Sequence, residues 1–213
     1  MKKTILLVVG LLILTGCTNI NKADIDTIVL EIQQSKIKVS SETRTGYKYY
    51  LPSDLNLLAT DNYNEIFLSR DYKYYMYVDI VSYYNKVKFN YEVNPNSYVS
   101  KNISYSNIDG YLEVNVKNEK YLIEIMYNYA KIELIVDYGY LKEAIANALI
   151  ILSTIKYNDD IINNMMGDNI LTLGEEQLNI FETNNGESNF LEYLDEYDDY
   201  TGDDVLPDPD LLR

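Results

Sequence analysis

The hydrophobic pattern of this chain changes its period at Gly139, and this change limits the fold more than any other feature. Between residues 47 and 137, short aromatic and aliphatic segments alternate with clusters of turn residues, which is typical of strands joined by turns. Over residues 140–156, apolar side chains recur at intervals of four and three residues, the spacing of an amphipathic helix. Strands followed by a helix predict the α+β class.

We therefore expect a mostly antiparallel sheet of about six to seven strands, packed by the long helix at 140–156 and by an N-terminal helix. The N-terminal helix is predicted at 24–36, where apolar residues share one face. Asp24 or Asp26 can cap its start by accepting a hydrogen bond from a backbone N–H group.

The segment 72–84 is apolar or aromatic on both faces, so it predicts a central strand covered on both sides. Asp109-Gly110 suits a type I′ turn and predicts a hairpin. The other predicted strands are 47–52, 65–69, 87–93, 102–108, 111–117, 121–126 and 131–137. Further short elements are expected at 159–166 and 190–197 (helices) and at 169–173 and 177–181 (edge strands or packed loops).

Composition divides the chain into four parts. Residues 1–16 predict a signal peptide, 17–23 a lipidated tether, 24–182 a single α+β domain, and 183–213 an acidic C-terminal tail. The chain is 47% hydrophobic, which is enough for a core. The chain holds one cysteine, so it can form no intramolecular disulfide and its stability must come from packing.

The leader carries two lysines before an apolar run from Ile5 to Leu14. A helix that spans a bilayer needs about 20 residues, so this run predicts a secretory signal. Leu14-Thr15-Gly16-Cys17 resembles the lipobox of bacterial lipoproteins. The resemblance implies that the thiol of Cys17 receives a diacylglyceryl group and that the chain is cut before it. The alternative is an ordinary cleaved signal with an incidental cysteine.

Two acyl chains give stable anchoring, whereas one holds only marginally. The lipobox therefore implies a protein anchored by lipid on Cys17 to the outer face of the bacterial cytoplasmic membrane. The formal charge of −15 argues against a nucleic-acid partner and suggests that the body stands off from an anionic membrane surface.

The chain has no histidine, which excludes Ser-His-Asp and Cys-His catalysis and removes the commonest metal ligand. We expect no cofactor, no metal and no catalytic residue. The 23 tyrosines fit either the codon usage of an AT-rich genome or a tyrosine-lined ligand surface.

The layout also resembles the PsbP/Mog1-like α/β/α sandwich. The parts that carry this resemblance, which covers roughly Gly46 to Tyr157, are Gly46 to Pro52, the closing hairpin and the helix segment Ala148 to Ile155. That family more often has Gly and Trp after the proline, where this chain has Ser53 and Asp54. Because its members are mostly binding or assembly factors, the resemblance implies an accessory role and transfers no functional residue.

Three patterns leave alternatives open. Asp79, inside the predicted strand 72–84, is either a catalytic carboxylate of elevated pKa or an acid that pairs with a lysine or lies at a sheet edge. The acidic run 195–204 either binds calcium or is a solvated tail. The tyrosines of 72–84 either stack on sugars or cover the sheet.

The sequence thus favours a non-catalytic, membrane-anchored binding or assembly module, with an envelope protein or a glycan as partner. The alternatives are a cell-envelope hydrolase that uses carboxylates, and a solute-binding lipoprotein of a transporter. The sequence gives no indication of the oligomeric state.

Overall fold

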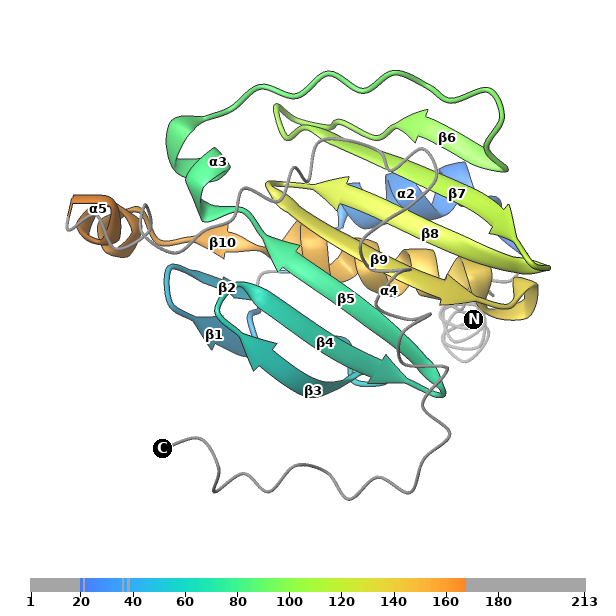
Figure 1. Ribbon diagram of the computed structural model, residues 1–213, viewed down its shortest axis with the longest axis horizontal. Coiled ribbons are helices and arrows are strands. Elements are labelled where there is room, and N and C mark those ends of the chain that lie inside the picture. Colours follow the sequence, from blue (N-terminus) through green and yellow to red (C-terminus); the bar gives the residue numbers. More distant parts are fainter. Residues whose placement is uncertain (1–19, 21, 36, 38, 168–213) are drawn as a thin grey trace, which may run out of the picture. The chain divides into compact units, whose positions relative to one another are not determined.

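The computed structural model describes residues 20, 22–35, 37 and 39–167 (Figure 1). It confirms the α+β class, since a seven-stranded antiparallel sheet and a three-stranded sheet are packed by helices. The chain divides into two units, Met1–Phe181 and Glu182–Arg213, and all described residues belong to the first.

The large sheet has the strand order β3-β4-β5-β9-β8-β7-β6, and every neighbouring pair is antiparallel. Its strands are β3 (Asn56–Asp61), β4 (Asn64–Ser69), β5 (Tyr72–Val78), β6 (Val99–Asn102), β7 (Gly110–Lys117), β8 (Lys120–Tyr127) and β9 (Ala130–Val136). The small sheet has the order β1-β2-β10 and consists of β1 (Glu42–Arg44), β2 (Tyr47–Tyr49) and β10 (Lys156–Tyr157).

Two helices cover one face of the large sheet: α2 (Ile25–Gln34) and α4 (Leu141–Thr154) lie behind it in Figure 1. The helix α4 packs on β8 and β9, and α2 packs on α4. The apolar stripe of α4 is fully buried, and Asp24 caps α2 by accepting the Thr27 N–H at 2.7 Å. Both predicted helices are therefore confirmed. The shorter helices are α3 (Ile80–Asn85), the 3₁₀ turn η2 (Tyr138–Tyr140) and α5 (Asp159–Gly167).

The prediction of one strand over 72–84 is wrong beyond Val78. The strand β5 does lie inside the sheet, between β4 and β9, but the chain then turns into α3. The turn forms because the Asp79 carboxylate accepts the Ser82 N–H at 2.7 Å, and this local hydrogen bond competes with a continued ladder.

The predicted strand 87–93 is also wrong, since residues 86–98 form an irregular connection from α3 to β6. Its alternating aromatic residues pack on the sheet without joining the ladder. The ring of Tyr91 stacks on that of Tyr111 with centroids 4.6 Å apart, and the ring of Phe89 lies 5.3 Å from the same ring. The aromatic residues of this segment alternate because they contact the sheet, although the segment is not one of its strands.

The predicted hairpin before β7 exists, but its turn is elsewhere. The tight turn joins Tyr105 to Ile108, with Ser106 and Asn107 at positive φ, and β6 ends at Asn102 instead of extending over 102–108. Gly110 instead begins β7, where a Cβ would lie 2.8 Å from the carbonyl oxygen of Met126. This glycine is required by close packing against β8.

The sequence did not predict β1 and β3. The strand β1 lies within a polar connector, and all six residues of β3 are exposed, so neither carries an alternating hydrophobic pattern. The other described predictions, for residues 47–52, 65–69, 111–117, 121–126, 131–137 and 159–166, correspond to β2, β4, β7, β8, β9 and α5. The predicted segments 169–173, 177–181 and 190–197 and the tail 183–213 lie outside the described residues.

Candidate functional site

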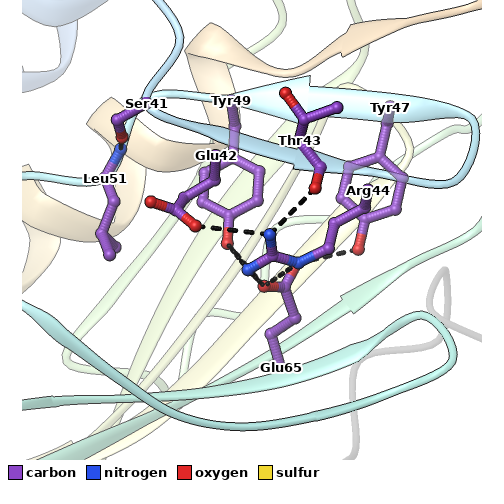
Figure 2. Close-up of polar contacts among 8 residues, drawn as sticks. All are labelled: Ser41, Glu42, Thr43, Arg44, Tyr47, Tyr49, Leu51 and Glu65. Carbon is purple, nitrogen blue, oxygen red and sulfur yellow. Dashed lines mark hydrogen bonds and ion pairs between the residues drawn. The ribbon is translucent and has the colours of Figure 1, made fainter.

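A buried carboxylate, Glu65 of β4, joins the two sheets (Figure 2). Its side chain has 0% exposure, and it binds the guanidinium of Arg44 at 2.7 Å. The hydroxyls of Tyr47 and Tyr49 point at the same carboxylate from β2 and donate to it at 2.8 and 2.5 Å. Glu42 contacts the outer side of the Arg44 guanidinium at 3.3 Å.

This cluster is a structural joint between the small and the large sheet. Burial, together with the hydrogen bond to Glu65, raises the pKa of the Tyr49 hydroxyl well above its ordinary value, so that it stays a donor at physiological pH. Each oxygen of Glu65 already accepts at least one hydrogen bond from these neighbours.

A second buried carboxylate, Glu113 of β7, holds the connection 86–98 onto the sheet. Tyr91 donates to it at 2.5 Å, Ser97 at 2.9 Å, Asn94 at 3.2 Å and Asn115 at 3.1 Å. Burial alone would raise the pKa of Glu113, but these hydrogen bonds outweigh it and the net pKa lies below the ordinary value. Glu113 is therefore an ionised carboxylate that accepts hydrogen bonds from four neutral side chains.

The third buried carboxylate, Glu124, stands opposite Glu113 on β8. It accepts a hydrogen bond from the Tyr111 hydroxyl and lies 3.3 Å from the Lys131 ammonium, which also binds Glu133 at 2.9 Å. Burial raises the pKa of Glu124, Lys131 and Tyr111 lower it, and Glu133 raises it again; the net pKa lies above the ordinary value.

Asp79, the carboxylate singled out as a catalytic candidate, does not lie within a strand. It is the N-cap of α3, and the strand prediction on which its catalytic interpretation depended is wrong. The strand tyrosines of residues 72–78 divide by face: Tyr74 is fully buried in the core, whereas Tyr75 and Tyr77 are half-buried on the other face.

One exposed feature of the described residues is the edge strand β3. All six of its residues are exposed, including Leu57 at 38% and Leu58 at 51%. The strand pairs with β4 on one side and ends the order of the sheet on the other. Its register skips Leu58, so that Leu57 pairs with Phe67 and Ala59 with Ile66.

A second exposed feature is a group of tyrosines at one end of the large sheet. Tyr138 is 63% exposed and Tyr98 is 50% exposed, and Tyr121 lies between them with ring centroids 5.6 and 5.0 Å away. Tyr98 and Tyr138 line a pocket of about 210 Å³ together with Ile25, Gly139, Leu141 and Lys142.

Sequence reasoning did not find Glu65, Glu113 or Glu124. Glu113 and Glu124 each stand between two apolar residues and so resemble solvent-facing strand positions, and Glu65 follows the turn residues 61–64 at the start of its strand. The predicted site residues Leu14, Thr15, Gly16 and Cys17 lie outside the described residues, as does the acidic run 195–204. None of the helices in the described part of the chain is long and apolar enough to cross a bilayer. In the same part, no group of three or more carboxylate or cysteine side chains is placed to hold a metal ion.

Comparisons of the chain with protein-family models, with curated proteins and with solved structures found no match.

Proposed function

We propose that this protein is a non-catalytic binding module, anchored by lipid on Cys17 to the outer face of the bacterial cytoplasmic membrane, that holds an extended segment of an envelope protein along β3. The observation that carries the proposal is the open edge of β3, with all six residues exposed. An extended peptide that adds to such an edge gains main-chain hydrogen bonds, and its side chains contact those beside the edge.

The two edges of the sheet differ in a way that supports this role. The edge strand β6 has four residues, three of them half-buried, and the connection 86–98 bonds to it through Ser100, whose hydroxyl accepts the Asn94 N–H at 2.7 Å. Proteins usually shield an edge with lysine, proline or a covering segment. The strand β3 contains neither lysine nor proline, although it is longer.

The partner of β3 is a different chain and not a second copy. The formal charge of −15 makes two copies of the chain repel each other, and it favours a partner segment that is neutral or basic.

The buried carboxylates favour binding over the hydrolase alternative. Glu65 is held by an arginine and two tyrosines, Glu113 by four neutral donors, and Glu124 by Tyr111 and Lys131. These contacts occupy both carboxylate oxygens of Glu65 and Glu113 and one oxygen of Glu124, the atoms that a hydrolase would direct at a substrate. The proposed resemblance to PsbP/Mog1-like proteins implies the same accessory role.

The test is co-purification of partners from a mild detergent extract of the host envelope, with wild type compared to Leu58→Lys. A lysine at an open edge obstructs strand addition, so the variant should lose the partner that wild type retains. The matched control is Val93→Lys, another exposed aliphatic residue (58%), which lies in the connection beside the opposite edge.

Once that partner has been identified and purified, hydrogen exchange should show that the β3 amides at residues 56–61 are better protected in the complex than in the free protein. Equal recovery of partner by Leu58→Lys and wild type, or protection that falls elsewhere, would refute the role of β3. A Cys17→Ala protein that stays on the membrane would refute the anchor.

A further inference from the structure

Three tyrosines and a valine lie at one end of the large sheet, which we call the tyrosine end: Tyr98, Tyr138 and Val116, which are exposed, and Tyr121, which is half-buried. The register of the ladder brings them together, since Tyr121 pairs with Val116 on one side and with Val136 on the other. Val116 is 55% exposed. Figure 1 shows the turn between β7 and β8, the end of β9 and the start of α4 together at this end, on the right.

The N-terminal tether joins the fold at the tyrosine end. The Lys142 ammonium, in the first turn of α4, donates to the carbonyl oxygen of Ala23 at 2.6 Å. Two residues further on, Ile25 lines the same pocket as Tyr98 and Tyr138. The point at which the chain enters α2 is thus fixed beside the tyrosines.

Chain length then limits the distance from this surface to the lipid. Cys17 and Ala23 are six residues apart, and an extended chain spans at most about 3.3–3.6 Å per residue, or about 20 Å in all. A lipid on Cys17 therefore keeps Ala23 within about 20 Å of the bilayer, and Lys142, which binds Ala23, lines the same pocket as Tyr98 and Tyr138.

The local charge at the tyrosine end differs from that of the whole chain. Lys117 and Lys120 are exposed on either side of the turn that leads to Tyr121, and one acid, Glu119, lies between them. The neighbouring acid Asp137 accepts the Tyr72 hydroxyl at 2.6 Å.

Two further acids are paired with cations, since Glu143 binds Arg70 at 2.9 Å and Asp26 forms an ion pair with Lys101. Asp24, next to Ala23, accepts the Thr27 N–H as the N-cap of α2. The total of −15 is therefore a poor guide to the charge that this end presents to a membrane.

We infer that the tyrosine end is the surface that rests on the anionic headgroups of the membrane to which the protein is anchored. Tyrosine is enriched at membrane interfaces because its ring is apolar whereas its hydroxyl is hydrated. Lysines near an anionic surface add attraction. The inference rests on the lipid anchor of the proposed function, and it leaves the β3 edge at the side of the sheet open to a partner.

A single-tryptophan experiment tests this orientation, since the chain contains no tryptophan. The lipidated full-length product of Tyr138→Trp is reconstituted on phosphatidylglycerol vesicles, with and without bromine on the acyl chains. The control is Tyr84→Trp, because Tyr84 is also exposed (41%) but lies in α3, which follows the opposite end of β5. Equal urea midpoints of both variants and wild type show that the fold is kept.

On vesicles, the tryptophan fluorescence of the Tyr138→Trp protein should shift to shorter wavelength, and brominated lipid should quench most of it. The fluorescence of the Tyr84→Trp protein should change little in either respect. In the Tyr138→Trp protein, the double change Lys117→Glu and Lys120→Glu reverses both charges and should reduce the quenching. The change Lys88→Glu in the same protein should not reduce it.

Sedimentation with the vesicles separates the two proposals. Lipidated protein that sediments but shows no quenching of the Tyr138→Trp variant overturns the orientation and leaves the anchor standing. Lipidated protein that stays in solution overturns both. An emission shift caused by soluble cell-wall glycan, without quenching by brominated lipid, would identify the tyrosine end as a sugar site and overturn the membrane contact.

Discussion

Glu113 and Glu124 face each other directly across the β7–β8 ladder, yet their pKa values move in opposite directions. Both are almost fully buried, and burial is the largest influence on both pKa values and raises each of them. At Glu113 the hydrogen bonds from neutral donors outweigh burial and favour the charged form. At Glu124 burial prevails over Lys131 and Tyr111, and the second acid Glu133 adds to it.

Glu113 should make the fold sensitive to acid. A native pKa below the ordinary value means that its contribution to stability is present above the unfolded pKa, near 4.5, and is lost as pH falls through the native pKa. Glu113→Gln should lower the free energy of unfolding by about 1–3 kcal/mol at pH 7. At pH 3 the loss should be smaller, as urea unfolding at both pH values would measure. An equal loss at both would contradict the account.

Glu124 should behave in the opposite way. A native pKa above the ordinary value means that its contribution is largest below the unfolded pKa and declines as pH rises through the native pKa. In Glu124→Gln the amide oxygen still accepts from Tyr111, and Lys131 keeps Glu133 at 2.9 Å. The same urea measurement at pH 7 should show a change below about 1 kcal/mol, of either sign. A greater loss than in Glu113→Gln would refute this.

The joint between the sheets depends on the charge of Glu65. Glu65→Gln leaves the Arg44 guanidinium without its buried partner and should cost about 2–3 kcal/mol, seen as a lower urea midpoint. Glu42→Gln is the matched control, because Glu42 touches the same arginine at 3.3 Å but is more exposed, and its loss should stay below about 1 kcal/mol. Similar costs for the two variants would show that Glu65 is not the joint.

Two glycines in regions of different packing provide a further test. A Cβ at Gly110 meets the ring of Tyr127 and the carbonyl oxygen of Met126, so Gly110→Ala should destabilise by about 1–3 kcal/mol through overpacking. A Cβ at Gly139 meets nothing within 4 Å, and Gly139→Ala should stay within about 0.5 kcal/mol of wild type. Thermal unfolding followed by circular dichroism would distinguish them, and a harmless Gly110→Ala would contradict the packing around β7.

The sequence was sufficient to predict the elements in which the spacing of apolar residues matches the buried positions. The apolar stripe of α4 and the apolar runs in β7, β8 and β9 are visible in the sequence because these residues are buried in the core. It failed where one local hydrogen bond decides the path, as at Asp79, and where an element makes few apolar contacts, as in β3. Residues 87–93 show the converse error, because aromatic alternation there comes from contact with Tyr111.

The sites were less accessible to sequence reasoning. Glu113 alternates with Leu112 and Val114 like any exposed residue of a strand, and what buries it is the connection that carries Tyr91. The tyrosine end draws on Tyr98, Tyr121 and Tyr138, which come from three separate segments. Only strand register and packing show that they are neighbours.

The proposed anchor at Cys17 is tested most directly by the mass of the N-terminal peptide of the protein extracted from host membranes. The account predicts a peptide that begins at Cys17 and carries a diacylglyceryl group on its sulfur, with or without an acyl group on its amine. A peptide that retains Leu14 to Gly16, or a Cys17 with a free thiol, would contradict it.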